Sequence, residues 1–182
     1  MARVQTRVAT RSRQNRRSCR KETTVGSGRL APLHWTRNLK NDEYIKEIVA
    51  ASIRRHGHDM AKWVGTRLWD QGDCQLKTKL SAACDLDSVE QPILYSYIDS
   101  ANWTLVTTRR IWSAADGRVN SVAASDVIET KWGKFKGYHE TSERLQLRGR
   151  NGETYYRPYE TGDPSMGTIY AIRTLRQVTR VE

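Results

Sequence analysis

Residues 92–113 read PILYSYIDSANWTLVTTRRIWS, and the rest of the fold can be worked out from this stretch. Aromatic and β-branched residues dominate it, and apolar side chains tend to recur at every second position, which is typical of strands and not of helices. The segment Asp99–Asn102 supplies turn-forming residues between two such runs. We therefore predict a β-hairpin that begins at Pro92, with strands over Ile93–Ile98 and Trp103–Ser113.

Further turn signals downstream extend the predicted sheet. Asp116-Gly117 is a tight-turn dipeptide, and Asn151-Gly152 favours a type I′ turn, so each should join two antiparallel strands. The short runs between and around these turns are rich in residues that favour strands. The strands predicted on this basis are Arg118–Ala123, Val127–Trp132, Arg144–Arg148 and Glu153–Tyr159.

The last predicted element is an amphipathic helix that starts at Asp163-Pro164. Asp163 is placed to cap the helix, and Pro164 occupies the first helical position, where its missing N–H is harmless. Apolar residues then recur at helical spacing, so one face of this helix should cover the open end of a sheet or barrel. The β-domain therefore spans residues 92–179, and the face consists of Met166, Ile169, Tyr170, Ile172 and Leu175.

Upstream of this domain, over residues 40–86, the hydrophobic period is helical. The best-marked helix follows Asn41, whose side chain can cap the first turn, and Gly57 is placed to close it in a left-handed conformation. Two further helices are predicted over Asp59–Asp70 and Asp73–Asp85. All three are too short to be stable alone, so they should pack on one another or on the β-domain.

Six or seven short antiparallel strands closed by one helix resemble the pleckstrin-homology (PH)-like fold. The run WTLVTTRRIWS (residues 103–113) and the acidic-hydrophobic strand SDVIET (residues 125–130) look like the core of bacterial PH-like and GRAM-type domains. The resemblance covers about residues 92–178. It implies an α+β protein in which N-terminal helices precede a PH-like antiparallel β-barrel or sheet closed by a C-terminal helix. It also implies a scaffold that binds lipid headgroups, peptides or partner proteins and performs little chemistry.

One family feature is missing. Members of the PH-like family that bind phosphoinositides do so largely with basic residues in the first hairpin turn. The corresponding turn here, Asp99–Asn102, contains an acid and no base. This departure argues against phosphoinositide recognition.

A better candidate for an anionic ligand is residues 131–139, KWGKFKGYH, where lysines alternate with aromatic residues around two glycines. The lysines would supply charge for phosphates, and the rings would offer faces to bases or anchor in a membrane interface. The alternative is that Trp132 and Phe135 fill the end of the barrel while the lysines are solvated. The candidate ligand-binding residues in this loop are Lys131, Trp132, Lys134, Phe135, Lys136 and Tyr138.

Arg109 and Arg110 are two further candidates for ligand contact. Adjacent residues on a strand face opposite ways, so one of the two should point toward the interior unless the strand ends there. An ion pair with Asp126 or Glu129 is the competing interpretation, and we favour it over ligand contact because a buried cation needs a partner.

The net charge of +11 is concentrated at the N-terminus. Residues 1–30 hold nine Lys or Arg and one Glu, a charge of +8, which leaves +3 for the rest of the chain. We predict a disordered basic leader over residues 1–32. Three interpretations compete: an arm that contacts phosphates, a transit peptide for an organelle, and a solvated tail or translated sequence upstream of the real start. The polyanion-binding candidates are Arg11, Arg13, Arg16, Arg17 and Arg20.

The titratable residues form no standard catalytic or metal-binding pattern. His56 and His58 could join Cys74 or His34 at a metal, but their spacing matches no usual zinc motif. Glu153, Glu160 and Asp163 flank a turn and could act as paired carboxylates, although Asp163 already has a capping role. The sequence contains no phosphate-binding loop, no G-x-S-x-G and no H-E-x-x-H. We therefore predict no catalytic residue, no metal site and no cofactor.

The three cysteines, Cys19, Cys74 and Cys84, are scattered and odd in number, which favours free thiols in a reducing compartment. We expect a soluble, cytoplasmic, non-catalytic binding or scaffolding module that recognises a protein, a peptide or an anionic ligand. The first alternative is a nucleic-acid-associated protein that uses the basic arm with the loop at residues 131–139. A small metal-dependent enzyme and contact with a membrane surface are less favoured alternatives.

Overall fold

The computed structural model describes residues 41–137 and 141–180. Within these residues the chain forms three α-helices, α1 (Asp42–His56), α2 (Cys74–Ala83) and α3 (Asp163–Thr179), and three single turns of 3-10 helix, η1 (Met60–Lys62), η2 (Trp69–Gln71) and η3 (Ala124–Asp126). The strands are β1 (Thr66–Leu68), β2 (Pro92–Tyr97), β3 (Trp103–Thr107), β4 (Arg110–Ala115), β5 (Arg118–Ala123), β6 (Val127–Lys131), β7 (Ser142–Gly149) and β8 (Thr154–Glu160).

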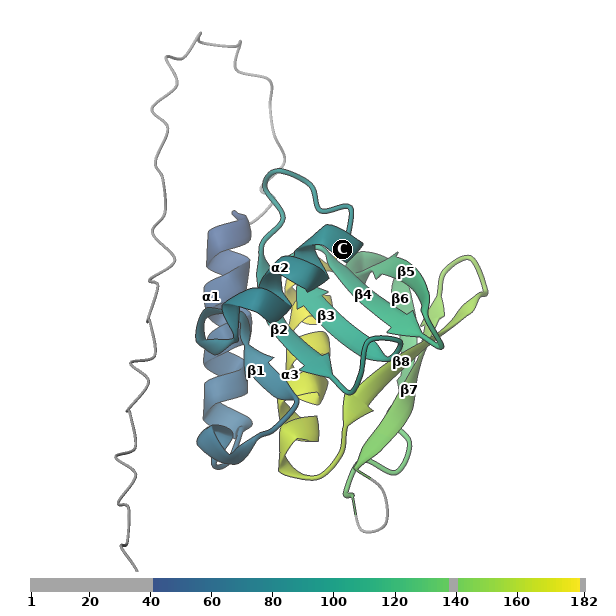
Figure 1. Ribbon diagram of the computed structural model, residues 1–182. Helices are drawn as coiled ribbons and strands as arrows, with labels where there is room; N and C mark the ends of the chain where they lie inside the picture. The colour runs from purple at the N-terminus through teal and green to yellow at the C-terminus, as the bar shows by residue number, and fades with distance from the viewer. Residues whose placement is uncertain (1–40, 138–140, 181–182) are drawn as a thin grey trace, which may run out of the picture. The chain divides into compact units, whose positions relative to one another are not determined.

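The strands form two antiparallel sheets (Figure 1). Sheet A has the order β1-β2-β3-β4-β5, and sheet B has the order β6-β7-β8. The predicted α+β class is confirmed, but the sheets do not close into the predicted barrel. The edge strand β8 of sheet B crosses one face of sheet A instead: Thr104 on β3 donates to the carbonyl of Pro158 on β8 (2.6 Å), and Ser113 on β4 approaches the carbonyl of Tyr156 (3.4 Å).

The predicted strand Trp103–Ser113 is two strands, because the chain reverses at Thr108 and Arg109. The Thr107 hydroxyl accepts from the N–H of Arg110 and also lies within hydrogen-bonding distance of its carbonyl (both 2.9 Å). This side chain satisfies backbone groups at the turn, so the ladder can end there. Beyond the turn the register pairs Leu105 with Trp112 and Val106 with Ile111, which places large apolar side chains opposite each other on both faces.

The predicted helix Asp59–Asp70 is wrong. Thr66–Leu68 pairs with β2 as an edge strand, with Thr66 opposite Ser96 and Leu68 opposite Leu94. Just before this strand, the Glu160 carboxylate accepts the backbone N–H groups of residues 64, 65 and 66 at 3.3, 3.0 and 2.8 Å. Tertiary hydrogen bonds therefore outweigh the helical spacing of the apolar residues in this short segment, of which only the single turns η1 and η2 are helical.

The predicted start of α1 is confirmed, because Asn41 caps the helix through the N–H of Glu43 (3.2 Å). Asp73 caps α2 through the N–H of Leu76 (2.9 Å), and α2 ends at Ala83, before the predicted Asp85. Gly57, however, has an ordinary φ of −83°. A Cβ at this position would lie 2.9 Å from the Trp63 ring. Glycine is therefore needed at this position because a side chain would collide with Trp63, and not because the backbone is left-handed.

Two turn predictions are corrected in the C-terminal half. The N-cap of α3 is Gly162, whose φ is +72°, and Asp163 is the first residue of the helix with Pro164 beside it. In the β7–β8 turn only Gly152 has a positive φ, so the turn is not type I′, which needs positive φ at both central residues. Asp116 and Gly117 both have positive φ, at 52° and 77°, and form the tight turn that their sequence predicts.

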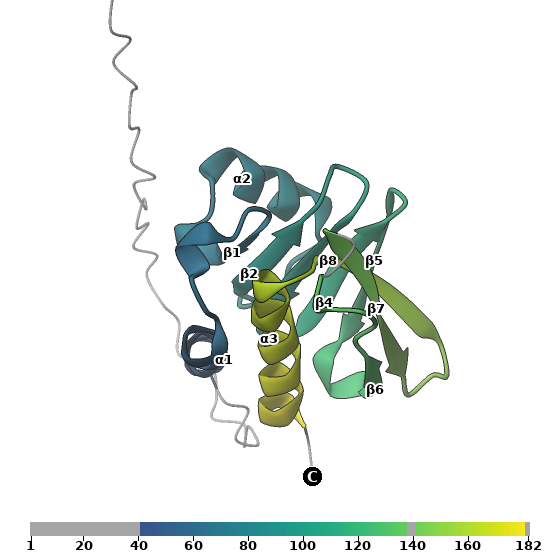
Figure 2. The same cartoon turned by 90° about the horizontal axis from the view of Figure 1, so that it is seen from below.

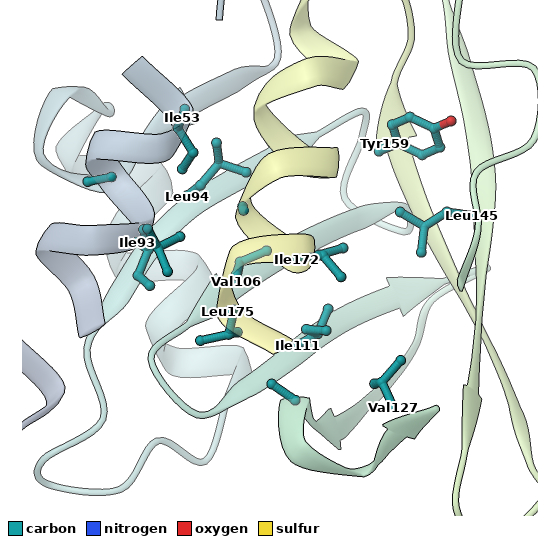
Figure 3. Packing of buried hydrophobic residues seen from close by; sticks show 14 of the residues in the cluster. Ile53, Ile93, Leu94, Val106, Ile111, Val127, Leu145, Tyr159, Ile172 and Leu175 are labelled. Atoms are coloured by element: carbon teal, nitrogen blue, oxygen red, sulfur yellow. The ribbon is translucent and has the colours of Figure 1, made fainter. Parts of the chain in front are cut away.

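Sheet A is covered on both faces (Figure 2). Helices α1 and α3 lie side by side on one face, and α2 lies on the other. The larger core lies between sheet A, these two helices and the inner face of sheet B, where Ile172 and Leu175 of α3 approach Val106 and Ile111 (Figure 3). Because Ile53 of α1 belongs to the same cluster, the helical segment and the β-domain share one core. The smaller core under α2 contains Leu80, Cys84, Tyr95, Trp103, Leu105, Trp112 and Ala114.

Gly167 on α3 tests how tightly the helix packs. A Cβ there would lie 2.7 Å from the Trp63 ring and 3.3 Å from Leu94. Helix propensity alone would favour Gly167→Ala by about 1 kcal/mol, but overpacking costs roughly 1–3 kcal/mol. We predict a net loss of about 1 kcal/mol in urea unfolding. Gln177→Ala, at an exposed position of the same helix, serves as control, and a stabilised Gly167→Ala variant would contradict the packing.

Candidate binding surface

The lysine-rich loop that follows β6 is anchored by its backbone and its aromatic rings. Trp132 and Phe135 pack against the larger core. The Tyr159 hydroxyl donates to the carbonyl of Trp132, and the N–H of Gly162 donates to the carbonyl of Phe135 (2.8 Å). Both aromatic residues therefore occupy the structural role that the sequence offered as the alternative to ligand contact.

The lysines of the same loop lie on its outer side. Lys131, Lys134 and Lys136 are exposed, and the N–H of Lys134 donates to the Glu143 carboxylate (3.2 Å). Gly137, with a φ of +69°, lies so close to Gly162 that a Cβ would approach the Gly162 nitrogen to 2.8 Å. An ordered loop therefore presents these ammonium groups to solvent. Tyr138 and His139, the end of the predicted site, lie outside the described residues, as does the basic arm.

Arg109 and Arg110 form ion pairs, as predicted, but with other partners than Asp126 or Glu129. Arg109 makes a two-pronged contact with Asp42 at the start of α1, at 3.1 Å from Nε and 2.9 Å from Nη2. Arg110 pairs with Glu90 through Nε (2.9 Å) and Nη2. The predicted acids lie elsewhere: Asp126 ends the turn η3, and Glu129 on β6 pairs with Lys131 and Arg148.

Glu90 is the centre of a buried polar network beneath α2. Its side chain is fully buried and accepts from Arg110, from the Thr107 hydroxyl and from the Trp112 indole (3.4 Å). Burial by itself would raise the pKa of Glu90, but the hydrogen bonds and charge of Arg110 together with the Thr107 hydroxyl outweigh it and lower the pKa. Glu90 therefore holds the β3–β4 hairpin as an ionised carboxylate.

We predict that Glu90→Gln lowers the free energy of unfolding by about 2 kcal/mol at neutral pH, because it leaves Arg110 without its charged partner. Since the pKa of Glu90 is lowered on folding, its contribution is complete above the ordinary value of 4.5 and disappears as the pH falls through the folded pKa. Urea unfolding from neutral to acidic pH should show a flatter profile for Glu90→Gln. The exposed Glu47→Gln variant serves as control. If the pH profile of Glu90→Gln equals that of the unsubstituted chain, Glu90 is not the ionised partner of Arg110.

Arg157 on β8 is a buried cation that the sequence analysis missed. It is fully buried between the two sheets, and its Nη1 donates to the Ser113 hydroxyl (2.6 Å) and to the Asn120 carbonyl oxygen. Its Nε and Nη2 have no hydrogen-bond partner among the described residues. Burial lowers the pKa of Arg157 to about 10, so it stays protonated at neutral pH. The sequence could have indicated this burial, because Arg157 alternates with Tyr155 and Tyr159 along the strand and therefore lies on the same face as these two aromatic residues.

A buried cation without a carboxylate partner should cost stability. We predict that Arg157→Met raises the free energy of unfolding by about 2 kcal/mol, because an apolar side chain of similar length removes the desolvation cost. Chemical denaturation measures the change, with the exposed Arg148→Met as control. If Arg157→Met is destabilised instead, the hydrogen bonds of the guanidinium group outweigh its desolvation cost, and the prediction is wrong.

Two of the candidate catalytic and metal-binding side chains, His56 and Glu160, have structural partners. His56 stacks on Tyr170 of α3 (centroids 3.8 Å apart) and lies 2.9 Å from the carbonyl of Ser52 through Nδ1. Burial raises the pKa of Cys84 to about 12, so it is a thiol. Glu160 binds backbone N–H groups before β1 and is not paired with Asp163. No group of three or more His, Cys, Asp or Glu side chains in the described part of the chain could hold a metal ion.

A hollow of about 430 Å³ lies at the N-terminal end of α3. The charged side chains of its lining are the acids Asp59, Glu160 and Asp163 and a single cation, Lys62, which pairs with Asp59 at 2.7 Å. Negative charge dominates, so the hollow does not suit the anionic ligand that the lysine loop was predicted to bind.

The outer edge of β5 is the longest strand edge of sheet A that no other described strand pairs with, since β5 ends the sheet and β1, at the other end, has three residues. Residues 115 and 118 flank the two-residue turn and form the hydrogen-bonded pair that closes such hairpins. Counting along β5, Val119, Ser121 and Ala123 therefore direct their N–H and C=O groups away from β4. Val119 is 45% exposed at this edge.

Comparison with known proteins assigns no relative. No family model, no curated protein and no solved structure matches the chain. Within the described residues, no helix is both long enough and apolar enough to cross a bilayer.

Proposed function

We propose that the chain is a non-catalytic binding module, built on a PH-like domain, that recognises an extended segment of a protein partner. The observation that carries the proposal is the outer edge of β5, with which no other strand of the described residues pairs. A six-residue strand edge with exposed residues at Arg118, Val119 and Asn120 offers backbone groups in the spacing that a strand of another chain needs.

The order of the elements supports the PH-like part of this proposal. A four-strand meander, β2 to β5, is followed by a three-strand meander, β6 to β8, and then by α3. Helix α3 packs on β2, β3 and β8, so it covers the junction of the two sheets. This order of strands and final helix supports the resemblance, although the two sheets do not close into a barrel, and the helical segment of α1 and α2 precedes it.

The composition of the edge also favours a peptide partner. Natural proteins protect exposed edges with lysines, prolines or bulges. Strand β5, RVNSVA, contains no lysine or proline, and its register with β4 runs without a bulge from Arg110–Ala123 to Ala115–Arg118. An edge that is regular and unprotected is suited to β-strand addition, in which main-chain hydrogen bonds supply affinity.

Ser121→Pro tests this edge directly. Proline removes the outward N–H and is tolerated at the open edge of a sheet, whereas Ser121→Val keeps the N–H and a strand-favouring side chain. Peptides selected from a random phage-displayed library on the full chain should bind Ser121→Pro at least about tenfold more weakly, the worth of one or two hydrogen bonds. They should bind Ser121→Val nearly unchanged.

The proposal fails if no peptide can be selected, or if the selected peptides bind the proline and valine variants equally well. Thermal unfolding of both variants checks that the edge substitution leaves the fold intact. A second check uses the peptide itself: N-methylation at alternate backbone positions should abolish binding at one phase and leave the other phase unaffected, because only every second residue pairs with β5.

A further inference from the structure

The outer face of sheet B collects side chains from all three of its strands. Leu145 and Leu147 point into the larger core, so Arg144, Gln146 and Arg148 between and beside them point outward. The register then defines two rows across this face. One row is Lys131, Gln146 and Tyr156, and the other is Glu129, Arg148 and Thr154.

Tyr156 is the aromatic residue of this face. Its side chain is 47% exposed, in contrast to Tyr159, which is fully buried on the opposite side of the same strand. A tyrosine ring that lies half-exposed on a regular strand offers a fixed apolar surface to a flat partner. Its row neighbours across the sheet are an amide, Gln146, and an ammonium group, Lys131.

The positive charge of the described residues gathers in the same sheet. Among the described residues, positions 127–160 hold seven Lys or Arg and four Glu, whereas all other described positions together hold thirteen Lys or Arg and thirteen Asp or Glu. Of the seven cations only Arg157 is buried. The net charge of +3 of the described part of the chain therefore belongs to sheet B and its loops.

The acids on this face do not neutralise it. Glu129 is shared between Lys131 (3.7 Å) and Arg148 (3.6 Å), so one carboxylate faces two cations. Lys134, Lys136 and Arg150 are exposed and form no ion pair with any described residue. Exposed ion pairs at such distances contribute little to stability. Lys131 and Arg148 can therefore exchange Glu129 for a phosphate group at small cost in free energy.

We propose that the outer face of sheet B, centred on Tyr156 and flanked by Lys131 and Arg148, binds single-stranded nucleic acid. Lysine and arginine would contact phosphates while an unpaired base stacks on the Tyr156 ring. A duplex fits this face less well, because its base faces are already stacked on one another and are not available to the Tyr156 ring. The site is separate from the β5 edge, so it does not rest on the peptide-binding proposal.

Fluorescence anisotropy with labelled oligothymidylate and oligouridylate tests the site. All proteins are full chains in which Arg11, Arg13, Arg16, Arg17 and Arg20 are replaced by Gln, which removes five of the nine cations of residues 1–30 and so weakens binding by the arm in every variant alike. Tyr156→Leu should weaken binding about tenfold, and Tyr156→Phe should restore it, because stacking needs the ring and not the hydroxyl. Tyr44→Leu, on α1 and 52% exposed, should have no effect.

The double variant Lys131→Gln, Arg148→Gln reports on the binding of phosphates. It should reduce the slope of log affinity against log salt by about 0.7 for each phosphate that is no longer neutralised. Comparison of the two oligomers shows whether DNA or RNA is preferred. The proposal is overturned if Tyr156→Leu binds as tightly as Tyr44→Leu, if a duplex of equal length binds as well as the single strand, or if anionic vesicles bind and neither oligomer does.

Discussion

Strand β3 is buried on both faces, and most of the architecture follows from this constraint. All five of its residues, Trp103–Thr107, are buried, and they alternate between the larger core and the core beneath α2. A strand that lies between two apolar layers needs cover on each side, so α1 and α3 pack on one face of sheet A and α2 on the other (Figure 2). Where the helices end, polar residues of β3 and β4 meet β8 instead, through Thr104 and Ser113. No described helix or strand covers the outer edge of β5 or the outer face of sheet B, and these are the two surfaces that we propose for partners.

Polar side chains stabilise the fold in addition to apolar burial, and they form hydrogen bonds at the places where strands begin or end. Glu90 holds the β3–β4 hairpin through Arg110 and Thr107. Glu160 binds the chain as it enters β1. Arg176 on α3 donates to the carbonyls of residues 127 and 128 in β6 (3.1 and 3.0 Å). These charged groups replace backbone pairing at irregular points, which explains why residues that a sequence offers as binding candidates, Arg109 and Arg110 above all, are engaged within the fold.

Elements with a strong local signal were predicted from the sequence, and elements defined by tertiary partners were not. The cap Asn41, the turn at Asp116-Gly117 and the period change at Pro92 are local, and the structure has each of them. The strand β1 exists only because β2 and Glu160 supply its hydrogen bonds, so its helical pattern was misleading. The same holds for the candidate surface: the lysine loop was visible in the sequence, whereas Tyr156 and the edge of β5 become candidates only when the register is known.

Native-state hydrogen exchange of the full chain is the most direct test of the burial of β3 on both faces, since it reports which backbone amides are hydrogen-bonded and protected. We predict that the amides of β3 are among the slowest to exchange. We further predict an alternation along β5, with Asn120 and Val122 protected and Val119, Ser121 and Ala123 exchanging fast. Uniform protection along β5 would mean that its edge is already covered, and fast exchange throughout β3 would mean that the sheet is not buried on both faces.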